Sequence, residues 1–286
     1  MIHIATVHHN TDKWIEMQAG YFKRCIEEPY RVYACLTGIE RLRHDSFYYV
    51  ADVPGGHAEK LNFLADRIVS RAAPEDLIIF IDGDAFPICK SIIPFIREKI
   101  ARHKLIAVRR DENYGDPQPH PSFCATTAGF WKDIGGDWQR GYHWVNTRGQ
   151  VVCDVGGKLL LKLKGIDWLP LIRTGKNFFH PLFFGIYGDI VYHHGAGFRD
   201  QPTRADLRGR RVFHLKKVFA GKAANGKHYS RVFFYVAERS IELFLIYVDK
   251  KNRLLKGYVY NQAVSDRNFF LRFLKKGRGR ASSRRL

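Results

Sequence analysis

Residues 76–82 read DLIIFID, and Gly83 and Asp84 follow directly. An isoleucine-rich apolar run of this kind predicts a strand that is buried on both faces of a parallel sheet. Open parallel sheets bind ligands at the carboxyl ends of their strands. The stretch therefore predicts an α/β protein whose ligand site lies around Asp82 and Asp84.

The chain on either side of this strand alternates short β-branched or aromatic runs with longer amphipathic ones, which is typical of strand–helix–strand units. Upstream, strands are predicted at 2–8, 31–37 and 46–52, and helices from Thr11 or Asp12 to about 28 and at 57–73. Downstream, helices are predicted at 90–102 and 156–164, strands at 105–110 and 186–194, and a strand leading into a helix at 122–131. This pattern predicts an α/β fold with a mixed, mostly parallel central sheet flanked by helices.

The strands and helices given so far all fall within residues 1–200, which form the predicted catalytic domain. Within it, the polar, proline-bearing loop at 111–121 is a candidate lid. Residues 201–286 differ in composition, because basic residues are frequent and 228–248 carries apolar residues at roughly helical spacing. This part is predicted to be a basic, mainly helical extension.

The Asp82-Gly83-Asp84 motif has the chemistry of a divalent-cation site. Two carboxylates separated by one residue in a turn can face the same hard cation, and a glycine between them lets a phosphate approach the backbone. A diphosphate bridged by Mg²⁺ or Mn²⁺ is the natural ligand. A DxD pair by itself is also common on solvated turns, and here the buried strand before it favours a functional site.

The order of the motifs resembles that of the GT-A-fold glycosyltransferases, particularly bacterial enzymes of surface-polysaccharide assembly. The resemblance rests on the leading strand IHIATVHH, the helix HAEKLNFLADRIV, the strand end FIDGDAFP and a later histidine-bearing strand. It covers roughly residues 1–200. It implies a GT-A (Rossmann-like) sheet, a Mn²⁺ or Mg²⁺ ion and a nucleotide-sugar donor, with a UDP-sugar favoured.

The same resemblance implies roles for individual residues. Asp84 would ligate the metal, Asp82 would contact the ribose or a metal-bound water, and His194, with His193 behind it, would supply the third ligand. Asp154, which precedes a Gly-Gly helix start, would deprotonate the acceptor hydroxyl or stabilise an oxocarbenium-like centre. The alternative for Asp154 is a helix N-cap, and Asp133 and Asp137 are weaker candidates for the catalytic carboxylate. For the histidine pair, the alternative is a structural hydrogen-bonding role or a chance surface position.

Contacts with the donor are implied at two further places. Thr6 and His8, at the end of the first strand, would face the nucleobase. Lys60 and Asn62, one turn into the helix after the third strand, would lie near the donor's phosphate or ribose. Lys60 is equally compatible with a solvated helical lysine, and His8 with a polar loop residue.

The chain has a formal net charge of +19, so an anionic partner is expected. Arg109 or Arg110, together with Arg173, are candidates to neutralise a diphosphate, since arginine matches phosphate geometry. The last twenty residues hold eight basic residues and no acidic one, and RNFFLRFLKK among them is basic and amphipathic. Such a segment can lie on an anionic membrane surface, which suits a lipid-linked glycan acceptor in lipopolysaccharide or capsule synthesis.

The expected location is the cytoplasm, with peripheral attachment to the inner face of the plasma membrane. The five cysteines are far apart and form no CxxC pair, which indicates a reducing compartment. The amino-terminal residues do not read as a secretion signal, and the apolar stretches are shorter than a membrane span. No motif for specific nucleic-acid binding is present.

Three other functions are compatible with part of the sequence. A haloacid-dehalogenase-like phosphatase would use Asp82 as its nucleophile, but its DxD motif normally opens the domain, and its later acidic motif would need a carboxylate at His193. A sugar-nucleotide pyrophosphorylase would need a glycine-rich basic loop where this chain has HHNTDKW. A non-enzymatic polyanion- or membrane-binding protein would explain the basic tail but not the two aspartates.

Overall fold

The structure, a computed structural model, describes residues 1–39, 46–111, 115–146, 150–175 and 185–195. Seven further residues are described singly, each in a helix: Val236, Arg239, Ser240, Leu243, Tyr247, Asn261 and Ser265. The rest of the predicted 201–286 extension, with its membrane-surface segment, lies outside the described residues. Within the described part, no helix combines the length and the apolar character needed to cross a bilayer.

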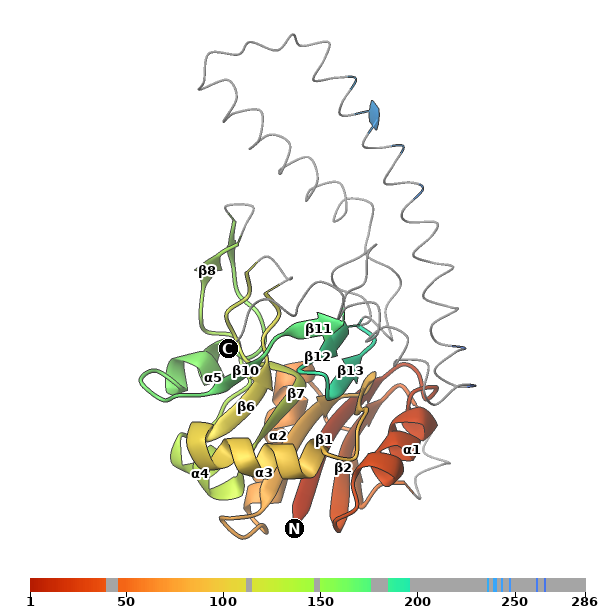
Figure 1. Cartoon of the computed structure of the whole chain (residues 1–286), viewed down its shortest axis with the longest axis vertical. Coiled ribbons are helices and arrows are strands. Elements are labelled where there is room, and N and C mark those ends of the chain that lie inside the picture. Colours follow the sequence, from red (N-terminus) through yellow and green to blue (C-terminus); the bar gives the residue numbers. More distant parts are fainter. Residues whose placement is uncertain are drawn as a thin grey trace.

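The central sheet has seven strands in the order β10-β6-β7-β4-β1-β2-β3 (Figure 1). They are β1 (Ile2–His9), β2 (Tyr30–Thr37), β3 (Tyr49–Ala51), β4 (Leu77–Asp82), β6 (Leu105–Val108), β7 (His120–Thr127) and β10 (Leu169–Leu171). Strand β7 is antiparallel to both of its neighbours, while the other four pairs are parallel. The prediction of a mixed, mostly parallel sheet is confirmed.

Helices cover both faces of this sheet (Figure 1). The described helices are α1 (Ile15–Cys25), α2 (His57–Val69), α3 (Ile92–His103), α4 (Ala128–Asp133) and α5 (Gly157–Lys162). Along β4, Ile79 and Ile81 pack in the core beneath α1 and α3, whereas Ile78 and Phe80 pack in the core beneath α2, α4 and α5. Because side chains alternate along a strand, Asp82 continues the second series and falls on the α2 side.

A second, four-stranded antiparallel sheet lies beside the carboxyl ends of the parallel strands (Figure 1). Its strands are β5 (Ala85–Pro87), β11 (Arg173–Gly175), β12 (Gly185–Tyr187) and β13 (Val191–His193), and a separate hairpin is formed by β8 (Trp144–Val145) and β9 (Val151–Val152). Strand β5 begins directly after Asp84, so the chain passes from the first sheet to the second at the aspartate motif.

Two predicted elements are corrected by the structure. The helix predicted from Thr11 or Asp12 begins at Ile15, and no side chain caps it. The single strand predicted at 186–194 is the hairpin of β12 and β13. Gly188 and Asp189 turn the chain there, with φ angles of 56° and 60°, and two successive positive φ values are the mark of a tight hairpin turn.

Candidate metal centre

The two aspartates lie at the junction of the two sheets. Asp82 is the last residue of β4, and Asp84 stands immediately before β5. Asp84 is buried and Asp82 is partly buried. The strand end therefore holds two carboxylates close together in a position largely shielded from water.

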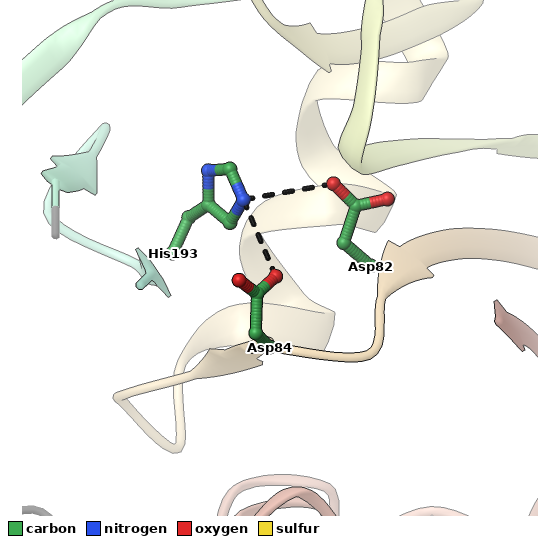
Figure 2. A group of neighbouring side chains, drawn as sticks. All are labelled: Asp82, Asp84 and His193. Carbon is green, nitrogen blue, oxygen red and sulfur yellow. Dashed lines mark ion pairs between the residues drawn. The ribbon is translucent and has the colours of Figure 1, made fainter. Parts of the chain in front are cut away.

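Strand β13 brings His193 to these aspartates. Antiparallel pairing with β5 places His193 opposite Ala85. The Nε2 atom of His193 lies 3.4 Å from Oδ1 of Asp84 and 3.6 Å from Oδ2 of Asp82 (Figure 2). In the described ranges, no other set of three His, Cys, Asp or Glu side chains places its ligand atoms so close together.

The donor set of this cluster fits a divalent cation. Two carboxylate oxygens suit Mg²⁺, and carboxylate oxygens with an imidazole nitrogen suit Mn²⁺. Neighbouring ligands of an octahedral cation, each about 2.1 Å from the ion, lie about 3 Å apart. The nitrogen–oxygen separations of 3.4 and 3.6 Å come close to that spacing, so small side-chain movements would complete the site.

The electrostatics of the cluster depend on the protonation of His193. Burial lowers the pKa of His193, but the carboxylates of Asp84 and Asp82 outweigh burial and leave that pKa raised above 6.5. When protonated, His193 would place an imidazolium between these two carboxylates. A cation bound here would displace the proton, because only neutral imidazole ligates a metal.

His57, the first residue of α2, also contacts the cluster. Its Nε2 lies 2.9 Å from Oδ1 of Asp82, on the α2 side to which that aspartate is directed. His57 was not predicted from the sequence. The only signal for it was its place at the start of the helix that precedes β4.

The predicted metal ligand His194 directly follows β13, and its side chain packs against Trp14 and Tyr192 rather than between the two carboxylates of Asp82 and Asp84. Neighbouring residues of an extended chain point in opposite directions, and the ring centroid of His194 lies 4.5 Å from that of Trp14. Its Nδ1 is 2.9 Å from the hydroxyl of Tyr192, and its backbone N–H donates to the carbonyl oxygen of Asp84 at 3.0 Å. Of the two histidines, His193 is therefore the one in the cluster that could hold a cation, and the predicted ligand role of His194 is not supported by its contacts.

Gly83 is required by the close approach of the motif to β1. A Cβ atom at Gly83 would lie 2.7 Å from both Nδ1 of His8 and the carbonyl oxygen of Val7.

Burial lowers the pKa of His8 to about 4, so this ring is neutral at physiological pH. Within the described part of the chain, Nε2 of His8 makes no hydrogen bond. Its predicted contact with a nucleobase stays a prediction.

Arg110 links Asp154 electrostatically to the cluster. Its Nη2 donates to Oδ2 of Asp154 at 3.0 Å and to Oδ2 of Asp116 at 3.2 Å. Burial lowers the pKa of Arg110, but Asp154 and Asp116, and more weakly Asp82, raise it overall. The other oxygen of Asp154 accepts a hydrogen bond from the N–H of Val155 at 2.8 Å. Two hydrogen bonds thus fix the orientation of Asp154.

Asp154 is not the N-cap of α5, which was the alternative prediction for it. Gly156 holds that position, in a left-handed conformation with a φ of 95°. A Cβ at Gly156 would clash with the carbonyl oxygen of Pro119, so glycine is needed there for space as well as for conformation. The Gly-Gly pair therefore starts the helix without the help of the aspartate.

Two predicted donor contacts have other partners. Thr6 is fully buried, and its hydroxyl donates to Oε1 of Gln18 at 3.3 Å. Its contact with a nucleobase stays a prediction. The side-chain amide of Asn62 donates to Oδ1 of Asp137 at 2.7 Å and accepts from the N–H of Trp138 at 2.9 Å. Both ends of this amide hold a neighbouring loop against α2, and a contact of Asn62 with the donor stays a prediction.

Lys60 is buried rather than solvated, which excludes the alternative prediction for it. Its Nζ donates to Oγ1 of Thr37 at 2.7 Å. Thr37 is the last residue of β2, so this ammonium lies at the same carboxyl edge of the sheet as Asp82. A contact with the donor's phosphate or ribose stays a prediction.

No protein-family model matches the chain, and no curated protein sequence does so either. Several solved transferase structures are similar to it. The mannosyltransferase PcManGT from Pyrobaculum calidifontis, in complex with GDP-Man and Mn²⁺, is 10% identical over 98% of this chain and 87% of that chain, with a TM-score of 0.43. A Drosophila β-1,4-galactosyltransferase 7 mutant, in complex with manganese, UDP-Gal and xylobiose, is 12% identical over 71% and 76% of the two chains, with a TM-score of 0.37.

Another similar structure is S. aureus TarS 1-349, which is 14% identical with a TM-score of 0.36. The match covers 48% of this chain and 50% of that one, so it spans about half of the TarS chain.

Proposed function

We propose that the chain is a metal-dependent glycosyltransferase that moves a sugar from a nucleotide-sugar donor to a glycan or a lipid-linked glycan. The observation that carries the proposal is the convergence of Asp82, Asp84 and His193 at the carboxyl edge of a mostly parallel sheet. Ligand sites of open α/β sheets lie at this edge. A divalent cation held there would neutralise the diphosphate of the leaving nucleotide.

Several of the chain's own groups favour an anionic donor at this edge. Lys60 places a buried ammonium at the end of β2, and Arg110 keeps its charge beside the cluster. The net charge of +19 attracts anions to the molecule as a whole. These cations would hold the phosphates and orient the sugar.

Asp154 is the proposed catalytic carboxylate. Arg110 and the N–H of Val155 fix its two oxygens, and 38% of its side chain remains exposed, so an acceptor hydroxyl can reach it. A carboxylate in this state can take the proton of the acceptor hydroxyl. In a retaining enzyme, it would instead stabilise the positive charge that develops at the anomeric carbon.

The finer parts of the proposal rest on the sequence. A UDP-sugar is the favoured donor by resemblance, and a lipid-linked precursor of lipopolysaccharide or capsule is the proposed acceptor. The basic amphipathic segment at 267–276 supports attachment to the inner face of the plasma membrane. Each basic residue near an anionic leaflet contributes about 1 kcal/mol, so several together would hold the protein there reversibly.

A thermal-shift screen of UDP-, GDP-, CMP- and dTDP-sugars, each with and without Mn²⁺, tests the proposal. A ligand that binds only the folded state raises its stability, so a Mn²⁺-dependent shift with one nucleotide would identify the donor class. Asp84→Asn is the matched variant, and it should lose the Mn²⁺-dependent part of the shift. If the native protein shows no shift with any nucleotide in either condition, the proposal is wrong.

The screen is paired with an assay that separates transfer from phosphate hydrolysis. A glycosyltransferase releases the nucleotide diphosphate and leaves it intact. Release of inorganic phosphate with a covalent aspartyl-phosphate at Asp82 would instead identify a phosphatase, and Asp82→Asn would then abolish the labelled adduct.

A further inference from the structure

Gln18 lies beneath the turn that carries the two aspartates. It is a buried residue of α1, and its side chain points from that helix toward the end of β4. The Nε2 atom donates to the carbonyl oxygen of Asp82 at 2.8 Å and to the carbonyl oxygen of Ala85 at 2.8 Å. These two carbonyls stand on either side of Gly83 and Asp84, so a single amide spans the whole motif.

Thr6 fixes the orientation of this amide. Its hydroxyl donates to Oε1 of Gln18 at 3.3 Å, so the oxygen faces β1 and the nitrogen faces the turn. Both N–H groups of Gln18 and its oxygen are thereby used. Glutamate could not donate to the two carbonyls, and an apolar side chain would leave both of them without these bonds, which is costly for buried groups.

The turn needs such support because it joins two different sheets. Asp82 ends β4 in the central sheet, and Ala85 begins β5 in the second sheet. A third carbonyl of the turn, that of Asp84, accepts from the N–H of His194 at 3.0 Å. The backbone that positions both carboxylates is thus held from α1 on one side and, on the other, from His194, which directly follows β13.

We propose that Gln18, oriented by Thr6, is a positioning residue that sets the spacing of Asp82 and Asp84 for cation binding. This inference rests on the proposed metal-dependent function, and it deepens it by coupling α1 to the metal centre. Partners that orient metal ligands from outside typically contribute roughly 10- to 100-fold to metal affinity. Gln18 touches neither the cation nor the substrate, so its effect is exerted through the geometry of the turn.

The test compares Gln18→Met and Thr6→Val with the native protein. Methionine has nearly the same length as glutamine and no charge, but it cannot donate to either carbonyl. Thr126→Val is the matched control, because the buried hydroxyl of Thr126 donates to the carbonyl oxygen of Lys104 at 2.7 Å, at the opposite end of the sheet. Mn²⁺ affinity is measured by electron paramagnetic resonance well below the melting temperature, and circular dichroism confirms that each variant is folded.

We expect Gln18→Met to weaken Mn²⁺ binding roughly 10- to 100-fold. Thr6→Val should weaken it less, in the same direction, because the amide is retained but loses the hydroxyl that orients it. Thr126→Val should lower the melting temperature without changing the affinity of the folded protein. If Gln18 had only a structural role, Gln18→Met would also lower the melting temperature without changing the Mn²⁺ affinity of the folded protein.

The outcomes separate the two proposals. If the native protein binds no Mn²⁺, the metal-dependent function is wrong and the role of Gln18 falls with it. If the native protein binds Mn²⁺ and folded Gln18→Met binds it equally well, only the positioning role is overturned. Should Gln18→Met fail to fold, Thr6→Val decides, since unchanged Mn²⁺ affinity in that variant would contradict the proposal.

Discussion

His193 lies opposite Ala85 in the antiparallel ladder of β13 and β5, and this pairing brings its imidazole next to the carboxylate of Asp84. The candidate metal centre is therefore assembled by sheet pairing between two segments that are distant in the sequence. A shift of one residue in this pairing would exchange the roles of His193 and His194, because adjacent side chains on a strand face opposite ways.

The two histidines give a matched pair of variants. His193→Ala removes a proposed ligand, so Mn²⁺ affinity should fall by more than the roughly 10- to 100-fold typical of residues outside the ligand sphere. His194→Ala should retain Mn²⁺ binding but lose about 1–3 kcal/mol of unfolding free energy, because the hydroxyl of Tyr192 loses its partner and a contact with Trp14 is lost. Calorimetric Mn²⁺ titration and urea unfolding measure the two quantities, and the reverse result would restore His194 as the ligand.

His57 should contribute to metal affinity through Asp82. His57→Leu removes the imidazole that lies 2.9 Å from the carboxylate, and we expect Mn²⁺ affinity to fall roughly tenfold. His57→Gln keeps a side-chain N–H donor and should recover most of the loss. Equal affinities of the native and leucine proteins, measured by Mn²⁺ titration, would show that this contact does not matter for binding.

Mn²⁺ binding should weaken as the pH falls. The proximity of Asp84 and Asp82 raises the pKa of His193 despite its burial, so the proton competes with the cation at and above pH 6.5. Calorimetry in buffers of different ionisation enthalpy should detect proton release on binding near neutral pH. His193→Ala should abolish that release, and a native protein that binds Mn²⁺ without releasing protons would contradict the assignment.

The raised pKa of His193 weakens Mn²⁺ binding at low pH, but it makes the metal-free fold more stable at low pH than at high pH. A group whose pKa is higher in the folded state stabilises the protein fully below its unfolded value of 6.5, and this contribution is lost as the pH rises through the folded value. Urea unfolding without metal should therefore show a loss of stability above pH 6.5, which His193→Ala lacks. Saturating Mn²⁺ should offset this loss, because the cation replaces the proton between the carboxylates.

His8 should destabilise the fold on acidification. Its folded pKa of about 4 lies below the usual 6.5, so the unfolded chain binds the extra proton first as the pH drops. The stability contributed by neutral His8 is present above pH 6.5 and is lost toward pH 4, with about 2 kcal/mol of the loss falling between pH 7 and pH 5. Urea unfolding of the native protein and His8→Gln at these two pH values measures it, and equal pH slopes would refute the prediction.

Asp154→Asn separates catalysis from binding. Asparagine keeps one acceptor oxygen, so it retains the hydrogen bond from either Arg110 or the N–H of Val155 and loses the other. Some stability should be lost, while Mn²⁺ affinity and nucleotide affinity of the folded protein should change little. The rate of sugar transfer should fall roughly 10²- to 10⁴-fold if Asp154 acts as a general base. The assay follows release of the nucleotide diphosphate under saturating donor, and an unchanged rate would exclude Asp154 from the chemistry.

Local sequence is enough to predict the strands and helices that lead up to the two aspartates. The apolar run of β4, the strands before it and the helix between them all follow from period and composition. The hairpin of β12 and β13 was read as one strand, because its turn at Gly188 and Asp189 is short and its flanks are both apolar. Short turns between buried segments are hard to distinguish from a continuous strand by hydrophobicity alone.

By itself, the sequence determined that Asp82 and Asp84 lie at the carboxyl end of a buried strand, because this depends only on residues that are neighbours in the chain. The choice of His193 over His194 depended on the pairing of β13 with β5, and the contacts of His57, Gln18 and Arg110 depended on how helices and loops pack on the sheet. Only the tertiary structure could decide these, because the direction of a side chain is set by the strand register and by the element packed against it.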